Sequence, residues 1–125
     1  MSKQVLIVDD EKNILTSLKF LMQQAGYTVQ TAMDGRVALA LIKRNPPDLL
    51  LLDIMLPQLD GFEVCRQIRA TPTHSAMKIV MLTAKGRETD AEKGLALGAN
   101  AYIHKPFSTR ELVQMVNRLL IDLVG

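Results

Sequence analysis

The chain has 125 residues, of which 48% are hydrophobic and 22% charged, and its formal net charge at pH 7 is +2. These values are typical of one folded domain with its own core. They exclude a disordered tail, a collagen-like repeat and a cystine-rich scaffold. The single cysteine, Cys65, cannot form an internal disulfide, which is consistent with a reducing cytoplasm.

Neither a membrane nor nucleic acid is expected as a partner. No apolar run approaches the ~20 residues that a membrane span requires, and the N-terminus lacks the features of a signal peptide. Lysines and arginines are scattered singly along the chain, and aromatic residues make up only 4% of it, with no tryptophan. We therefore expect a cytoplasmic protein that does not bind nucleic acid directly.

Short apolar runs alternate with helical patterns along the chain. The first helical pattern extends from Ile14 to Ala25 and is followed by Gly26 as a stop, and Gly98 is expected to end the fourth helix in the same way. The central apolar runs are continuous, as expected for strands that are covered on both faces. The five predicted strands are residues 5–8, 27–32, 49–52, 79–82 and 101–103.

The last helical pattern contains apolar residues from Leu112 to Leu123 and opens with Ser108 and Glu111 in capping-box positions. Strand and helix thus alternate five times, which predicts a parallel sheet with helices on both faces and right-handed crossovers. The predicted fold is α/β, a flavodoxin-like (βα)5 doubly wound parallel sheet with strand order 2-1-3-4-5. Residues 1–125 are expected to form a single domain, with no second domain in the sequence.

Polar residues follow the predicted strands, at the edge where an open α/β sheet binds its ligands. Asp10 alone could be explained as a helix N-cap. Three carboxylates in one crevice, however, raise one another's pKa and favour a bound cation. Hard oxygen ligands without cysteine or histidine indicate Mg²⁺ rather than Zn²⁺. The polar residues that follow the strands are Asp9, Asp10 and Glu11 after the first strand, Asp53 after the third, Thr83 after the fourth, and His104 and Lys105 after the fifth.

Four motifs in this order resemble the receiver domains of two-component response regulators, over essentially the whole chain. They are Asp-Asp-Glu at 9–11, Leu-Leu-Asp-Ile-Met-Leu-Pro-Gln-Leu-Asp-Gly at 51–61, Thr83-Ala84 and Lys105-Pro106-Phe107. The resemblance implies a phosphoacceptor switch of a phosphorelay. It also implies that the domain assists its own phosphorylation and dephosphorylation without being an enzyme. The implied partners are a histidine kinase or histidine phosphotransfer protein, and a downstream effector domain or protein.

The resemblance also implies residue roles at the acidic crevice. Asp53 is the expected phosphoacceptor, and it would ligate Mg²⁺ together with Asp10 and the backbone carbonyl of Met55. Asp9 would help to hold the ion, partly through water. Lys105 would pair with the phosphoryl oxygens. The protein itself supplies positioning and charge neutralisation, which is most of what phosphoryl transfer needs.

The resemblance further implies a switch on the last two strands. Thr83 would donate a hydrogen bond to the phosphoryl group and move inward, and Tyr102 would turn into the space that it leaves. The Lys105–Pro106 peptide bond is commonly cis in such proteins. Tyr102 can also be explained as a half-buried strand residue. His104 precedes Lys105 on an alternating strand, so it is expected to point away from the site without a catalytic role.

Two departures from the family pattern bear on assembly and phosphoryl lifetime. Asn100 and Ala101 occupy the positions of an acidic pair that many dimerising transcription-factor receivers carry, which argues against that symmetric dimer. A monomer or a phosphorylation-dependent dimer remains expected. Met55 and Lys85 flank the phosphorylation site, and Met55 cannot orient an attacking water, so we expect slow-to-moderate autodephosphorylation.

Other functions are less consistent with the sequence. A flavin carrier of this topology needs a Ser/Thr/Gly-rich phosphate loop after the first strand, where this chain has three acids. A Mg²⁺-dependent phosphohydrolase usually carries an Asp-x-Asp pair, with the second acid two residues after the nucleophile, whereas here Asp9 is followed at that distance by Glu11 and Asp10 by Lys12. The alternative that remains is a receiver-like adaptor that is not phosphorylated. Asp60 is a further carboxylate that a loop or cap role explains.

Overall fold

A computed structural model describes residues 2–84 and 86–121, so Lys85 and Leu123 lie outside the described residues. The chain alternates strands and helices, as predicted, and adds one short 3-10 helix. The elements are β1 (Gln4–Val8), α1 (Lys12–Gln24), β2 (Thr28–Ala32), α2 (Gly35–Arg44), β3 (Leu49–Asp53), α3 (Gly61–Arg69), η1 (Pro72–His74), β4 (Lys78–Ala84), α4 (Glu88–Ala96), β5 (Ala101–Lys105) and α5 (Thr109–Leu120).

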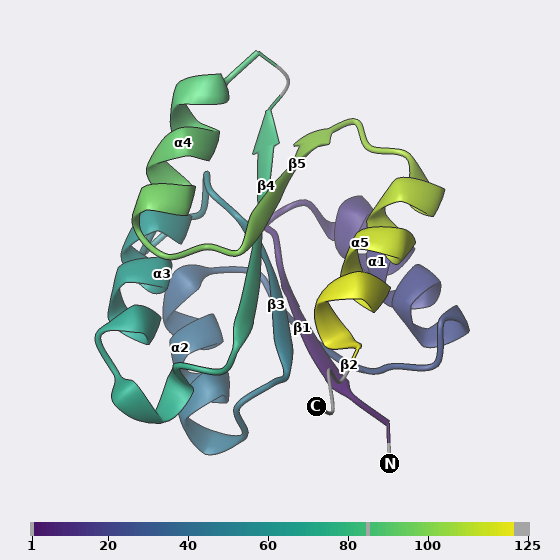
Figure 1. Cartoon of the computed structure of the whole chain (residues 1–125), viewed down its shortest axis with the longest axis horizontal. Helices are drawn as coiled ribbons and strands as arrows, with labels where there is room; N and C mark the ends of the chain where they lie inside the picture. The colour runs from purple at the N-terminus through teal and green to yellow at the C-terminus, as the bar shows by residue number, and fades with distance from the viewer. Residues whose placement is uncertain (1, 85, 122–125) are drawn as a thin grey trace.

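The five strands form one parallel sheet in the order β2-β1-β3-β4-β5, which confirms the predicted fold class. Helices α2, α3 and α4 cover one face of the sheet, and α1 and α5 cover the other (Figure 1). All five residues of β3 are buried, because this central strand is covered on both faces. Among the described residues, no helix is both long and apolar enough to cross a membrane.

Side chains of successive strand residues enter two separate hydrophobic clusters. On β4, Ile79 and Met81 join the cluster under α2, α3 and α4, whereas Val80 and Leu82 join the cluster under α1 and α5. This alternation is the period-2 rule of a strand, applied to a sheet with two buried faces. It places Thr83, the next residue of β4 with the parity of Ile79, on the α4 side of the sheet.

The predicted helix signals agree with the structure at several ends. The Ser108 hydroxyl accepts a hydrogen bond of 3.2 Å from the Glu111 backbone N–H, so it caps α5. Gly26 has φ +97° after α1, and Gly98 has φ +114° two residues beyond the end of α4. The N-cap position of α1 is Glu11, which makes no side-chain cap bond. The cap explanation of Asp10 is therefore wrong, and its carboxylate is not engaged in that role.

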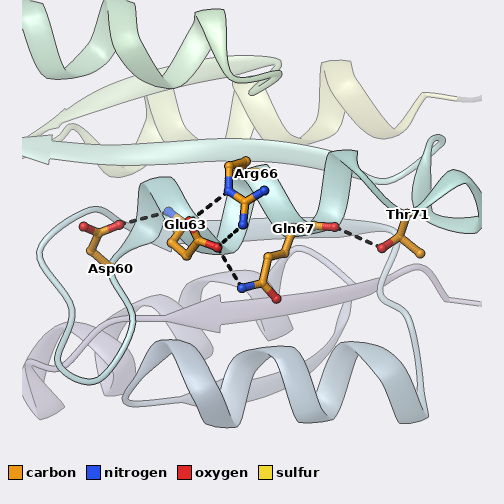
Figure 2. A network of polar contacts seen from close by, with 5 residues as sticks. All are labelled: Asp60, Glu63, Arg66, Gln67 and Thr71. Carbon is orange, nitrogen blue, oxygen red and sulfur yellow. Dashed lines mark hydrogen bonds and ion pairs between the residues drawn. The ribbon is translucent and has the colours of Figure 1, made fainter.

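Helix α3 carries a chain of polar contacts on its exposed side (Figure 2). Asp60 is the N-cap and accepts a hydrogen bond of 2.9 Å from the Glu63 backbone N–H, as the cap explanation predicted. The Glu63 carboxylate accepts hydrogen bonds from Arg66 and from Gln67, and these bonds lower the pKa of Glu63 to about 2. The Thr71 hydroxyl donates to the Gln67 carbonyl at 3.0 Å. These bonds fix the start and the end of α3.

Asp60→Ala is expected to lower the free energy of unfolding by about 1 kcal/mol, because a helix N–H loses its capping acceptor. Urea unfolding followed by circular dichroism measures this change. Asp60→Ser retains an acceptor at the N-cap and is the matched control, with a loss of at most a few tenths of a kcal/mol. Equal losses in the two variants would show that the cap bond of Figure 2 does not stabilise α3.

Candidate functional site

The predicted site residues lie at the carboxyl edge of the sheet. Strand β1 ends one residue before Asp9, and Asp53 and Lys105 are the last residues of β3 and β5. Parallel pairing brings these strand ends to one edge. The Lys105–Pro106 peptide bond that follows is cis, as the resemblance implies.

Three carboxylates converge at this edge. One oxygen from each of Asp9, Asp10 and Asp53 lies within 4.8 Å of the others. Asp9 is fully buried, Asp53 is 7% exposed, and Asp10 is exposed. Such a set of hard oxygen donors, open to solvent on one side, suits a partly hydrated divalent cation such as Mg²⁺. These three residues therefore fit the metal that the sequence implies.

Lys105 is the cation that faces this cluster. Its Nζ lies 2.7 Å from Asp9 Oδ2, 3.5 Å from Asp53 Oδ1 and 3.7 Å from Glu11 Oε1. Burial disfavours the charged ammonium, but the hydrogen bond to Asp9 and the three carboxylate charges outweigh it, so the pKa of Lys105 is raised. A single lysine thus neutralises only part of the acidic cluster.

Asp53 is a buried carboxylate whose pKa is raised at this site. Burial is the largest cause, and the negative charge of Asp9 adds to it, so the pKa of Asp53 rises from 3.8 to about 6. The positive charge of Lys105 opposes this rise but does not cancel it. A cation that binds beside Asp53 therefore stabilises its ionised form, which burial and the charge of Asp9 destabilise.

The cluster opens into a cleft of about 320 Å³, large enough for a small anionic group and its counterion. Met55, 69% exposed, lies at the rim of this cleft. Arg87 also lines the cleft, and its guanidinium pairs with Asp90 at 2.9 Å. The sequence does not point to Arg87 as a site residue, because it lies four residues beyond Thr83. A second groove, of about 460 Å³ between α2 and α3, shares no residue with this cleft, and none of the described residues that line it is a carboxylate.

A close backbone approach holds the loop that follows Asp53. The Gly61 backbone N–H donates to the Ile54 carbonyl at 2.8 Å. A Cβ on Gly61 would lie 2.4 Å from the Asp53 carbonyl oxygen and 2.8 Å from the Ile54 Cα. Only glycine fits there without moving the backbone of Asp53. Residues 54–60 therefore start and end beside the acidic cluster.

Thr83 is 2% exposed, and its hydroxyl forms a hydrogen bond of 2.7 Å with His104 Nδ1. The Tyr102 ring contacts the His104 ring edge-on, with centroids 5.3 Å apart. His104 does face away from the Lys105 side of the strand, but its contact with Thr83 is not predicted from the sequence. The contact follows from the parallel register of β4 and β5, which pairs Thr83 with His104 directly and which the sequence alone does not specify.

Comparison with known proteins agrees with this geometry. The response regulator receiver domain family matches residues 5–117. The alkaline phosphatase synthesis transcriptional regulatory protein PhoP of Bacillus subtilis is 48% identical over 120 residues, which are 96% of this chain and 49% of that protein. The chain thus spans about half the length of this curated relative.

Two solved structures share the fold over nearly their whole length. One is the receiver domain of the sensor histidine kinase PA1611 from Pseudomonas aeruginosa, with a magnesium ion coordinated in its active-site cleft (33% identity, TM-score 0.87, covering 95% of this chain and 98% of that one). The other is the BeF3-activated DrrB receiver domain (32% identity, TM-score 0.86, covering 96% and 98%). The chain belongs to the receiver domain family of two-component response regulators.

Proposed function

We propose that this domain is a phosphoacceptor switch in which Asp53 takes a phosphoryl group from a histidine kinase or a histidine phosphotransfer protein. The observation that carries the proposal is the meeting of Asp9, Asp10 and Asp53 with Lys105 at one strand edge. A partly neutralised acidic cluster beside an open cleft is suited to receive a phosphoryl group together with a divalent cation.

In the proposed transfer, a carboxylate oxygen of Asp53 attacks the phosphorus of a phosphohistidine. An O–P bond forms and the N–P bond breaks, with its electron pair going to the imidazole. Lys105, 3.5 Å from Asp53 Oδ1, is placed to pair with the phosphoryl oxygens. When bound, Mg²⁺ supplies charge neutralisation between the carboxylate and the phosphate. Asp10, Asp53 and the Met55 carbonyl are the proposed ligands, with Asp9 contributing partly through water.

Reversal of the signal is proposed to be hydrolysis of the acyl phosphate, assisted by the same residues. Met55 lies at the rim of the cleft and offers only an apolar thioether, which supports slow-to-moderate autodephosphorylation. Thr83 is the proposed donor to the phosphoryl group after transfer, and Tyr102 is the proposed aromatic switch. In this role the domain acts on itself and is not an enzyme.

Output is proposed to pass from α4, β5 and α5 to an effector domain or protein, with the domain as a monomer or a phosphorylation-dependent dimer. Asn100 Oδ1 accepts hydrogen bonds from the Ile79 backbone N–H at 2.8 Å and from Arg69 at 3.0 Å. This use of Asn100 within the domain supports an assembly different from the symmetric dimer that needs an acid there.

The single free cysteine, Cys65, supports a cytoplasmic location.

Intact mass spectrometry tests the proposed function. With acetyl phosphate and Mg²⁺, the chain should gain about 80 Da, the mass of one phosphoryl group. The gain should disappear with EDTA and in Asp53→Asn, whereas Asp60→Asn, a substitution at the α3 cap, should retain it. If the native chain gains no mass from acetyl phosphate or from a phosphorylated histidine phosphotransfer protein, and a Mg²⁺ titration detects no binding, the chain is a receiver-like adaptor.

A further inference from the structure

His104 is placed between two residues of the proposed switch. Its Nδ1 forms a hydrogen bond of 2.7 Å with the Thr83 hydroxyl, and its ring contacts the Tyr102 ring at an interplanar angle of 64°. All three side chains lie on the face of the sheet that α4 covers, because β4 and β5 alternate between two buried faces. His104 is therefore in contact with both residues of the proposed switch, Thr83 and Tyr102.

The hydroxyl of Thr83 has little freedom in this arrangement. Thr83 is 2% exposed, so water does not replace a lost hydrogen-bond partner readily. The walls of the acidic cleft include Leu82 and Ala84, but not Thr83 between them. The hydroxyl is thus engaged by β5 rather than presented to the cleft in which Asp53 lies.

We propose that His104 is a positioning residue that holds the Thr83 hydroxyl in the unphosphorylated state and so sets how readily the domain switches. The proposal rests on the proposed function, since it concerns the hydroxyl that would donate to the phosphoryl group. To reach that group, the Thr83 hydroxyl leaves His104, and the free energy of this hydrogen bond opposes activation. We call this Thr83–His104 hydrogen bond the latch, because it stabilises the unphosphorylated state.

Removing the latch should favour the activated state. His104→Phe retains a ring beside Tyr102 but has no hydrogen-bonding atom, so the buried Thr83 hydroxyl is left without its partner. The Thr83 hydroxyl can then donate to a phosphoryl oxygen, or to a mimic of it, without first breaking a hydrogen bond to residue 104. The expected effect is a gain in affinity for the mimic of about fivefold, the factor that corresponds to one net hydrogen bond.

The experiment measures beryllium fluoride binding in the presence of Mg²⁺ by isothermal titration calorimetry. His104→Phe should bind about fivefold more tightly than the native chain, the equivalent of one net hydrogen bond. His104→Asn, which places a polar atom near the position of Nδ1, should remain close to the native value. In a Thr83→Val background, His104→Phe should change nothing further, because the latch needs both partners.

His74→Phe is the matched control for the loss of a histidine. His74 lies in η1, and in the part of the chain that the structure describes its Nδ1 has no hydrogen-bond partner. This variant should bind beryllium fluoride like the native chain. Equal or weaker binding by His104→Phe, or the same gain in the Thr83→Val background, would overturn the latch.

A second measurement needs no substitution and applies even if His104→Phe fails to fold. The ¹⁵N resonance of His104 Nδ1 should shift when beryllium fluoride and Mg²⁺ are added, because its bond to Thr83 breaks, whereas that of His74 should not. An unchanged His104 resonance on saturation would contradict the latch. Failure of the native chain to bind beryllium fluoride at all would instead count against the proposed function, so the two failures are distinguishable.

Discussion

Asp53→Asn is expected to stabilise the metal-free domain at pH 7.5 by about 3 kcal/mol, although it removes the proposed phosphoacceptor. The native carboxylate is 7% exposed and lies beside Asp9, and its pKa is raised to about 6. At pH 7.5 it is therefore ionised at a free-energy cost that the unfolded chain does not have. The uncharged amide has a similar shape and avoids this cost.

The pH dependence follows from the direction of the shift. Because the folded pKa of about 6 exceeds the unfolded value of 3.8, Asp53 contributes stability that is fully present below pH 3.8 and is lost as the pH rises through 6. Glu63 behaves in the opposite way, since its pKa is lowered to about 2 and its contribution is lost only as the pH falls through that value. Glu63 is present in both chains and titrates well below the pH range of interest. The pH dependence of the stability difference between the native chain and Asp53→Asn therefore comes from Asp53.

Urea unfolding in EDTA at several values between about pH 4.5 and pH 7.5 measures this difference. The stability gain of Asp53→Asn should grow by about 2 kcal/mol across the range, and Asp60→Asn should give no comparable trend. Mg²⁺ should stabilise the native chain more than Asp53→Asn, because the variant retains only two of the three carboxylates. A gain that is independent of pH would show that Asp53 is not destabilised by its surroundings.

The fold could be predicted from the sequence because its signals are local and repeated. Continuous apolar strands such as residues 49–52, helix stops such as Gly26 and the capping pair Ser108 and Glu111 each depend on nearby residues only. The strand order then follows from the general behaviour of alternating strands and helices. Because the carboxyl ends of parallel strands share one edge, the grouping of Asp9 and Asp53 needed no further information.

The remaining features depend on register and on side-chain direction, which the sequence does not encode locally. Strand alternation places His104 opposite in direction to Lys105, but only the pairing of β4 with β5 shows that it meets Thr83. Arg87 precedes α4 and lines the cleft because of how that helix packs on the sheet. Helix α1 begins at Lys12, one residue later than an N-cap at Asp10 requires, so Asp10 does not cap it.

Lys105→Met is expected to destabilise the metal-free domain by about 3 kcal/mol and to tighten Mg²⁺ binding by about tenfold. The ammonium lies 2.7 Å from Asp9 Oδ2, and Asp9 is fully buried. Methionine fills a similar volume but leaves that carboxylate without its cation, and removal of one partner of a buried pair is strongly destabilising. The same loss of positive charge removes the repulsion that a second cation meets at Asp9, Asp10 and Asp53.

Two measurements separate the electrostatic effect of Lys105 from its packing. Urea unfolding in EDTA should give the loss in Lys105→Met, and saturating Mg²⁺ should restore most of it, because the ion supplies the missing positive charge. Lys105→Arg retains a cation and is the matched control, with a smaller loss and no gain in Mg²⁺ affinity. If Met and Arg at this position lower stability equally and Mg²⁺ restores neither, the side chain of Lys105 supports the site by its shape. Its charge would then not be what balances the buried carboxylate of Asp9.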